Sequence, residues 1–345
     1  MALKKGKQAV TLKDVAEAVG YSVNTVSRAL REKEDISKET RERIQKIALE
    51  LGYVNNALAS SLRLGYTKTI AVILGDISNP LFAIIMKEVE VHAAGSGYTS
   101  FLLNTNEDTE TEYKAIQTAI NKNVDGIILC PTQKSEDNIT FLKNSGIPFV
   151  LIGRHFETIP TDYVGSNDEL GGYQATKYLI EQGHRNILML NGPLYISSAA
   201  ERLTGYCRAL KEFGIPIRKE LICETSVTSG KNKEFLQKLD NSGVDYSAIF
   251  AFSDLLAWEA WAYLTESGKK VPEDCSLIGF DHIHSRLPLP FRLTTIDSQK
   301  KQMSVAAVEL LLERINSESG IDACHSIIID TSLALGETVS TPKTK

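Results

Sequence analysis

From Thr69 onward the sequence alternates short apolar runs with longer amphipathic segments, and this alternation limits the possible folds more than any other feature. The apolar runs are TIAVILG, YTSFLLN, VDGIILC, PFVLIG, NILMLNG, YSAIFAFSD, CSLIGFD and LTTID. Near-continuously apolar strands that alternate with helices are typical of parallel sheets covered on both faces. The strands are too many for one compact doubly wound domain. The sequence therefore predicts two α/β lobes, each with its own core.

The N-terminal part has an all-helical pattern instead. Thr11, Ser22 and Ser37 each precede a short amphipathic segment, and Gly20 and Gly52 follow the first and the third segment. Small polar residues favour helix N-termini and glycine favours the residue after a helix, so we predict three short helices. A tight turn with a glycine between the first two helices is the helix-turn-helix pattern.

Charge is distributed unevenly between these two parts. Residues 1–65 carry twelve Lys and Arg against eight Asp and Glu, which gives +4, whereas the rest of the chain carries 26 against 35, which gives −9. A basic head on an acidic body suggests a polyanionic partner for the head. A solvated basic surface is the alternative reading.

Other classes of protein are disfavoured by what the sequence lacks. No apolar stretch has the length of a membrane span, and none follows the basic N-terminus as a secretory signal requires, so we expect a cytoplasmic protein without a membrane partner. The five cysteines are scattered without C-x-x-C spacing, which favours buried free thiols over a disulfide or zinc framework. Without a P-loop, a nucleophile motif or a metal motif, we expect no catalysis, no metal and no cofactor.

The second helical segment, SVNTVSRAL, carries the candidate recognition surface. Its apolar stripe consists of Val23, Val26 and Leu30, and its polar face consists of Asn24, Ser27 and Arg28. In a helix-turn-helix the second helix lies in the major groove. Asn24 can pair with adenine and Arg28 with guanine, and Val23 can contact a thymine methyl. Short donors suited to phosphates are Thr11, Ser22, Ser27 and Asn55. A merely solvated polar face is the alternative.

Residues 11–53 resemble the DNA-binding head of the lactose/galactose-repressor family of bacterial transcription regulators. The matching elements are DVA at 14–16, TVSRAL at 25–30, S-x-x-TR-x-x-I at 37–44 and LGY at 51–53. The resemblance continues in family order through NNALASSLRLG, GDISNPLF, VDGIIL, ERLTGYCRAL, SDLLA, SLIGFD and LTTI. It implies a helix-turn-helix domain at 1–54, a hinge helix and linker at 55–68, and a two-lobed, periplasmic-binding-protein-like core for effector binding and dimerisation at 69–345.

The resemblance also assigns DNA contacts. It places Thr25 in the recognition helix, Asn55 and Ala59 at the hinge, and Leu62 where a leucine wedges into the minor groove and kinks the duplex. The alternative for Leu62 is an apolar residue of a linker helix packed on the core. Asn55 departs from the family, because many members have proline there. The partners implied are a near-palindromic operator and a second copy of the chain, with a tetramer as the alternative.

In the core the resemblance implies a small-molecule effector between the lobes. The residues assigned to it are Asp76, Ser78, Asn79, Phe82, Arg154, Arg202, Asp254 and Asp281. Arginine forks and carboxylates suit a polyhydroxylated ligand, so a sugar or sugar derivative is predicted. Capping of a following helix is the alternative for Asp76 and Asp254.

Two departures from the family bear on the effector. The stretch CETSVTSGK lacks the aromatic residue on which purine-binding members stack their ligand, and Gly153 stands where many members have an acidic residue. The missing aromatic residue disfavours a purine, and a purine-type or other corepressor is the alternative to a sugar. The prediction is a ligand-controlled repressor. One rival is an exported sugar-binding receptor, which needs a signal peptide and has no DNA-binding head. The other rival is an α/β enzyme.

Overall fold

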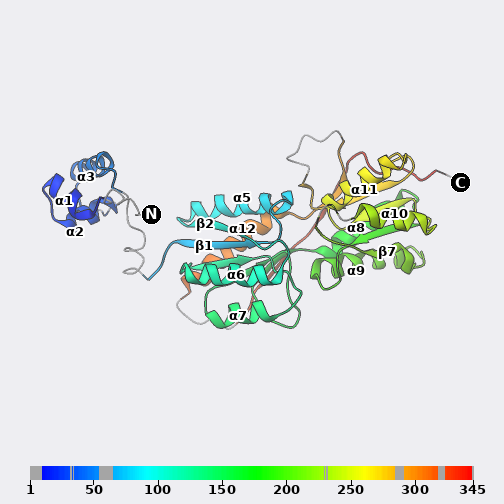
Figure 1. Cartoon of the computed structure of the whole chain (residues 1–345), viewed down its shortest axis with the longest axis horizontal. Coiled ribbons are helices and arrows are strands. Elements are labelled where there is room, and N and C mark those ends of the chain that lie inside the picture. The colour runs from blue at the N-terminus through cyan, green and yellow to red at the C-terminus, as the bar shows by residue number, and fades with distance from the viewer. Residues whose placement is uncertain are drawn as a thin grey trace, which may run out of the picture. The chain divides into compact units, whose positions relative to one another are not determined.

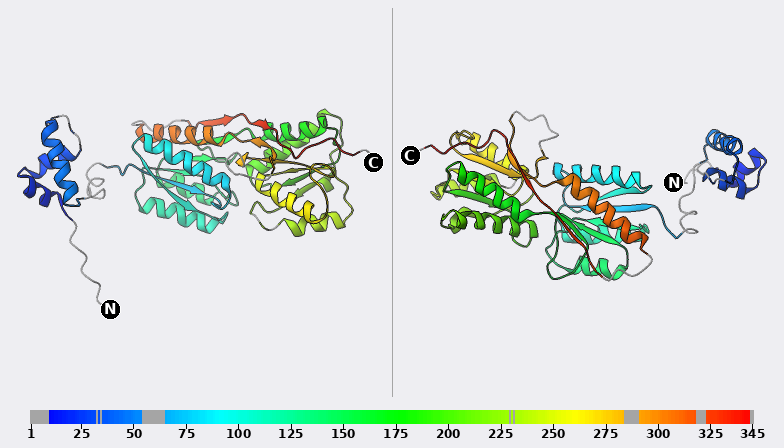
Figure 2. Two further views of the ribbon diagram at one scale, coloured as in Figure 1. Left: turned by 90° about the horizontal axis from the view of Figure 1, so that it is seen from above. Right: turned by 180° about the vertical axis from the view of Figure 1, so that it is seen from behind.

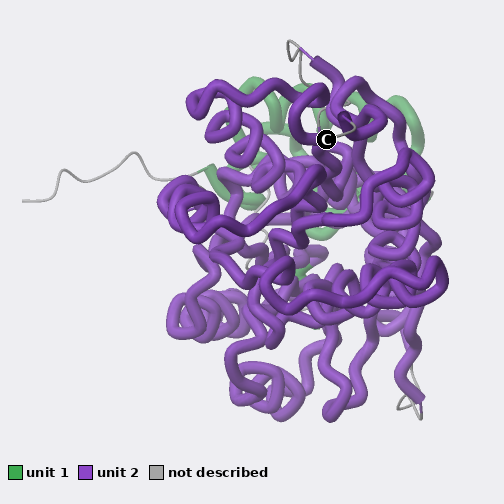
Figure 3. Tube along the Cα trace, turned by 90° about the vertical axis from the view of Figure 1, so that its right-hand side faces the viewer, with its two compact units in different colours: residues 1–67 green, residues 68–345 purple. Residues whose placement is uncertain are grey.

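The chain forms two compact units, residues 1–67 and residues 68–345 (Figure 1 and Figure 3). The structure is a computed structural model. It describes residues 10–31, 33, 35–53, 65–228, 230, 232–283, 291–317 and 323–343. No helix among these residues is long and apolar enough to cross a membrane.

The first unit contains the three helices that the sequence predicts, α1 (Leu12–Val19), α2 (Val23–Leu30) and α3 (Lys38–Glu50). The predicted caps are confirmed. The Thr11 hydroxyl accepts from the backbone N–H of Asp14 while the Asp14 carboxylate accepts from the backbone N–H of Thr11, which is a reciprocal capping box. Gly20 ends α1 at a φ of +75°, a conformation that glycine adopts without strain.

A small apolar core holds these three helices together. Its fully buried members are Val15, Val26, Ala29 and Ile44. The placement of Val23 in the apolar stripe is wrong, because its side chain is 44% exposed. Val23 is the first residue of α2, and the residues of α2 that are buried in the core are Val26 and Ala29.

The first lobe of the second unit is a parallel six-stranded sheet in the order β11-β5-β4-β3-β1-β2. Its strands are β1 (Thr69–Leu74), β2 (Thr99–Asn104), β3 (Gly126–Leu129), β4 (Phe149–Ile152), β5 (Tyr163–Ser166) and β11 (Ser326–Ile329). The helices α5 (Pro80–Gly95) and α12 (Lys300–Asn316) cover one face, and α6 (Thr109–Asn121) and α7 (Asp137–Ser145) cover the other (Figure 1).

The second lobe repeats this architecture in the order β12-β10-β9-β8-β6-β7, with only β12 antiparallel. Its strands are β6 (Ile187–Asn191), β7 (Ile222–Glu224), β8 (Ala248–Ala251), β9 (Ser276–Phe280), β10 (Thr294–Asp297) and β12 (Ser332–Ala334). Its helices are α8 (Asp168–Glu181) and α9 (Ser197–Glu212) on one face, and α10 (Lys233–Asn241) and α11 (Asp254–Glu266) on the other. The prediction of two doubly wound lobes is confirmed.

The chain crosses between the lobes three times. The crossings lie between β5 and α8, between β10 and α12, and between β11 and β12. The last two crossings belong to the C-terminal part of the chain, which is coloured orange to red (Figure 2). The sequence patterns do not predict β5, β7, β11 and β12, which are strands of three or four residues.

Helices α8 and α9 approach each other more closely than ordinary side chains allow. A Cβ atom on Gly172 would lie 2.2 Å from the backbone oxygen of Arg202, and one on Gly205 would lie 2.1 Å from the backbone oxygen of Glu169. Glycine at both positions therefore lets the two backbones come into direct contact. This contact positions the start of both helices, which face the gap between the lobes.

We expect Gly205→Ala to destabilise the second unit by about 1–3 kcal/mol, because its methyl group would overlap backbone atoms that cannot move aside. The matched control is Gly95→Ala in α5, where a Cβ would meet nothing within 4 Å. That change should be neutral or stabilise by up to about 1 kcal/mol. Urea unfolding followed by circular dichroism measures both. Equal unfolding free energies for the two variants would contradict the close packing.

Candidate functional site

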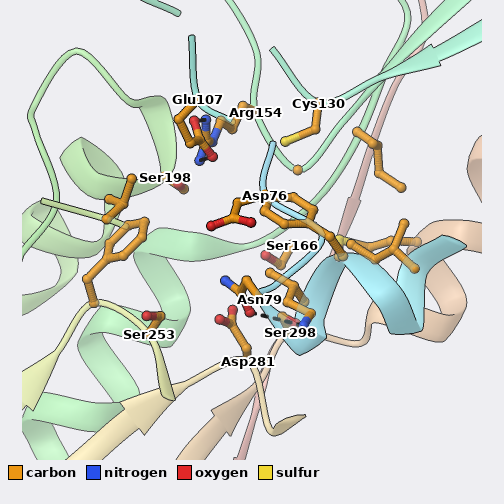
Figure 4. Close-up of a pocket in the computed structure, with 18 of the residues that line it drawn as sticks. Asp76, Asn79, Glu107, Cys130, Arg154, Ser166, Ser198, Ser253, Asp281 and Ser298 are labelled. Atoms are coloured by element: carbon orange, nitrogen blue, oxygen red, sulfur yellow. Dashed lines mark hydrogen bonds and ion pairs between the residues drawn. The ribbon is translucent and has the colours of Figure 1, made fainter. Parts of the chain in front are cut away.

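The carboxyl ends of parallel strands from both lobes meet around one pocket (Figure 4). In α/β sheets this edge is where ligands bind, because the loops after the strands lie there together. The polar residues that line the pocket are Asp76, Asn79, Glu107, Arg154 and Ser166 from the first lobe, Ser198, Arg202, Ser253 and Asp281 from the second, and Ser298 from the crossing after β10.

One wall of the pocket is apolar. It consists of Leu81, Phe82, Ile85, Cys130, Ile152 and Met303, with Val227 and Phe252 opposite. Burial raises the pKa of the Cys130 thiol to about 12, so the sulfur is protonated at neutral pH and is not a nucleophile. The pocket thus combines an apolar surface with groups that donate and accept hydrogen bonds.

Arg154 is bound at both ends of its guanidinium by Glu107. Its Nη1 donates to one carboxylate oxygen of Glu107 at 2.7 Å and its Nη2 donates to the other at 2.9 Å, and Nη1 also donates to the Pro131 carbonyl at 3.0 Å. The two side chains are drawn together at one side of the pocket in Figure 4. This fork-to-fork geometry is the strongest arrangement for this kind of pair.

Arg202 is bound within the second lobe. Its Nε donates to Asp168 at 2.7 Å, Nη1 donates to the Phe252 carbonyl, and Nη2 lies 3.9 Å from a carboxylate oxygen of Asp281. Its guanidinium carbon lies 3.5 Å from the ring centre of Phe280 and 4.4 Å from that of Phe252. These contacts fix the position of the guanidinium.

Burial shifts the pKa of two carboxyls near Arg202. Burial raises the pKa of Asp281 to about 8, although attraction by Arg202 opposes this shift. Burial also raises the pKa of Glu201 to about 8, and the charge of Asp168 adds to that shift. A protonated Asp281 can donate a hydrogen bond as well as accept one.

Two residues that the sequence predicts for the site lie elsewhere. Ser78 is exposed and does not line the pocket, and its backbone N–H donates to Asp76. Asp254 is fully buried, and its carboxylate accepts from the Ile283 backbone at 2.8 Å and from the Thr295 hydroxyl. Asp254 therefore ties α11 to β10 and to the loop after β9.

The helix-capping alternative is wrong for both aspartates considered. Asn79 caps α5 and Ser253 caps α11, each through its own side chain. Asp76 instead lines the pocket with Asn79, Phe82, Arg154, Arg202 and Asp281.

Sequence reasoning missed five polar residues of the pocket, namely Glu107, Ser166, Ser198, Ser253 and Ser298. Three of them, Ser166, Ser253 and Ser298, end a strand or follow one within two residues, so their position at strand ends was a usable signal. The Ser298 hydroxyl is buried and has no hydrogen-bond partner in the described part of the chain. A buried hydroxyl without a partner is uncommon in native proteins, so this group is available for a hydrogen bond to a bound ligand.

In the head, some candidate DNA-contacting residues are exposed on α2 and others cap the helices α1 and α2. Val23 and Asn24 are exposed at the start of α2, and Arg28 is half-exposed and forms an ion pair with Asp35. Thr11 and Ser22 cap α1 and α2, and Thr25 contacts the Ser22 hydroxyl at 2.8 Å. Ser27 is partly buried. The hinge candidates Asn55, Ala59 and Leu62 lie outside the described residues.

Comparison with known proteins agrees with this arrangement. Residues 67–334 match the family model of periplasmic binding proteins and the sugar binding domain of the LacI family, and residues 11–56 match that of bacterial regulatory proteins, lacI family. The HTH-type transcriptional repressor PurR of Pasteurella multocida (strain Pm70) is 34% identical over 310 residues, which are 90% of this chain and 93% of the relative.

Two solved structures with bound sugars are also similar. The transcriptional regulator CelR in complex with cellobiose is 28% identical with a TM-score of 0.72, over 95% of this chain and 99% of that one. A LacI family regulator from Enterococcus faecium with bound ribose is 27% identical with a TM-score of 0.70, over 80% of this chain and 100% of that one.

A helix-turn-helix head and a two-lobed core with a pocket between the lobes define a class of transcription regulators that respond to small molecules. The chain belongs to the LacI family of bacterial regulatory proteins. It is a DNA-binding transcriptional repressor of that family and not an enzyme.

The raised pKa of Asp281 predicts how stability depends on pH. In the unfolded chain this carboxyl titrates near pH 4. Between about pH 4 and pH 8 the folded protein therefore holds a proton that the unfolded chain has released, so its contribution to stability falls as the pH rises. Urea unfolding from pH 5 to pH 8 should show a shallower loss of stability for Asp281→Asn than for the wild type. The exposed change Glu110→Gln should keep the wild-type slope, and an unchanged slope for Asp281→Asn would contradict the shift.

Proposed function

We propose that this repressor binds a near-palindromic operator as a homodimer, and that a sugar or sugar derivative held between the lobes controls this binding. One helix-turn-helix head reads only a few base pairs, so specificity requires two heads related by a dyad. The observation that carries the ligand part of the proposal is the pocket between the lobes, where strand ends of both lobes present hydroxyl and carboxyl groups.

The chemistry of the pocket suits a sugar. A sugar ring has hydroxyls at its edge and apolar faces, and the pocket sets carboxyls and serines against an apolar wall. Asp76 and Asp281 accept from ligand hydroxyls in this proposal, and Asn79 and Ser298 complete the polar rim. A ligand hydroxyl at Ser298 would supply the hydrogen bond that this buried side chain lacks.

The ligand in this proposal acts by drawing the two lobes together. Strong hydrogen bonds between ligand hydroxyls and carboxyls need water to be excluded, which favours closure around the ligand. The three crossings between the lobes are the segments about which closure takes place. Closure changes the spacing of the two hinges in a dimer, and this change couples the pocket to DNA affinity.

A purine-type ligand is the second candidate, because several similar curated repressors carry the name PurR. The residues around Val227 offer no aromatic ring to the pocket, although Phe82 and Phe252 line it elsewhere. The similar structures with bound cellobiose and ribose favour the sugar. A thermal-shift screen with pentoses, hexoses and nucleobases, followed by calorimetry, distinguishes the two classes.

For the head we propose that Val23, Asn24 and Arg28 read bases and that Thr11, Ser22, Thr25 and Ser27 support phosphate contacts. Exposure of the first two side chains at the start of α2 supports this proposal, because the N-terminal part of a recognition helix meets the base edges. The ion pair of Arg28 with Asp35 is exposed, so little free energy opposes its exchange for a guanine. The hinge contacts proposed are Asn55, Ala59 and Leu62.

We expect Arg28→Ala to weaken binding to the preferred operator by about 1–3 kcal/mol and to relax the base preference at one position in each half-site. Its matched control is Arg43→Ala, an exposed arginine on α3, which should leave base preference unchanged. Selection from random DNA followed by fluorescence anisotropy measures both effects. Equal losses of Arg28→Ala on selected and random DNA would exclude base reading, and selected sites without a dyad would exclude the dimeric arrangement.

We expect Ser298→Ala to weaken ligand binding by about 1–2 kcal/mol while leaving the stability of the free protein nearly unchanged, because the hydroxyl has no partner to lose among the described residues. Calorimetry with the best sugar from the screen measures the affinity. Ser78→Ala is the control, since Ser78 lies outside the pocket lining, and its affinity should match the wild type. An unchanged affinity in Ser298→Ala would remove this residue from the site.

A further inference from the structure

The charge of Arg154 is already neutralised inside the pocket. Glu107 binds the guanidinium through both carboxylate oxygens, and the exposed fractions of the two side chains are only 8% and 12%. A buried guanidinium is the usual group for capturing a phosphate or a carboxylate, because its planar fork matches such anions. Here a carboxylate of the protein itself occupies that fork.

The loop between β2 and α6 and the neighbouring Gly75 place the Glu107 carboxylate beside Arg154. Glu107 has a positive φ of 56°, in the loop between β2 and α6. The preceding Asn106 donates its backbone N–H to the Gly75 carbonyl at 2.6 Å. A Cβ atom on Gly75 would lie 2.3 Å from the Glu107 carboxylate, so the glycine at the end of β1 makes room for it. The neighbouring strand thus leaves space for this carboxylate.

The other cations at the pocket are also engaged. Arg202 donates to Asp168 and to the Phe252 carbonyl, and it stacks between two aromatic rings. Lys300, at the start of α12, donates to the Asp281 carbonyl at 2.7 Å and lies 3.5 Å from Asp297. The other two acidic side chains of the described lining are Asp76 and Asp281, and burial raises the pKa of Asp281 so that it is mostly protonated at neutral pH.

We propose that this pocket admits uncharged ligands and rejects phosphorylated or carboxylated ones, and that Glu107 sets this selectivity by occupying Arg154. The proposal rests on the proposed function in one respect, namely that the effector binds in this pocket. An anion entering it would lose its hydration and would meet neutral donors and the like-charged carboxylate of Asp76, with no free cation among the described residues of the lining. This repulsion discriminates against sugar phosphates and nucleotides even where the rest of the molecule fits.

The first test uses the wild-type protein and matched pairs of ligands. The pairs are D-glucose with glucose 6-phosphate, D-ribose with ribose 5-phosphate, and inosine with inosine monophosphate. In every pair whose free member binds, the phosphorylated member should bind at least about tenfold more weakly, which corresponds to about 1.4 kcal/mol. A phosphorylated compound that binds as tightly as its free partner, or alone, overturns the inference.

The second test uses inorganic phosphate as the probe and needs no knowledge of the effector. Millimolar phosphate at constant ionic strength should leave the melting temperature of the wild type unchanged and should raise that of Glu107→Gln, because the near-isosteric amide releases the charge of Arg154. The control Glu110→Gln changes an exposed glutamate on α6 that pairs with Lys114, and it should behave as the wild type. The double variant Glu107→Gln/Arg154→Gln should lose the response.

The outcomes separate this inference from the proposed function. If a free nucleobase binds and no sugar does, the sugar assignment fails while the selectivity for uncharged ligands stands. If a sugar phosphate is the tight ligand, the effector site stands and the inference falls. If phosphate affects Glu107→Gln no more than the wild type, Glu107 does not set the selectivity.

Discussion

The buried guanidinium of Arg202 connects four elements of the second lobe beside the pocket. It comes from α9, its Nε donates to Asp168 at the start of α8, and it lies against Phe252 after β8 and Phe280 at the end of β9. A buried cation destabilises a protein unless its hydrogen bonds and its charge are both satisfied. Here the satisfaction requires α8 and α9 to be in direct contact, which the glycines at 172 and 205 allow. The geometry of one side of the pocket thus depends on this one group.

The same principle governs the other side of the pocket, with a different consequence. Arg154 and Glu107 come from loops of the first lobe, and their pairing leaves the described lining of the cavity without a free positive charge. Each lobe therefore balances its own arginine internally, and neither needs the other lobe to do so. A ligand can bridge the lobes through hydroxyls and carboxyls without breaking a buried ion pair. The three crossings, two of which border on pocket serines, then carry the closure.

In the head, the residues that stabilise the helices differ from those proposed to read bases. Its caps use Thr11, Ser22 and Ser37, and its core is a few small apolar side chains, so it needs no group from the exposed start of α2. Val23 and Asn24 are free to vary there without loss of packing. Arg28 is held by an exposed ion pair, which is weak in water and easily exchanged. The surface proposed to read DNA is thus separate from what holds the helices together.

Sequence patterns alone predict the helices, most of the strands, the two lobes and the family, because caps and apolar periodicity act between residues close along the chain. It also placed Asp76, Asn79, Phe82, Arg154, Arg202 and Asp281 at the pocket, through strand ends and family motifs. The burial of Asp254 and the outward position of Val23 became clear only from the folded structure. Glu107 and Arg154, which are far apart in the sequence, form an ion pair. Ser298 likewise lines the pocket beside residues that are distant along the chain. Such partners are selected by the packing of whole elements and by the need to satisfy buried charge, and no local pattern records them.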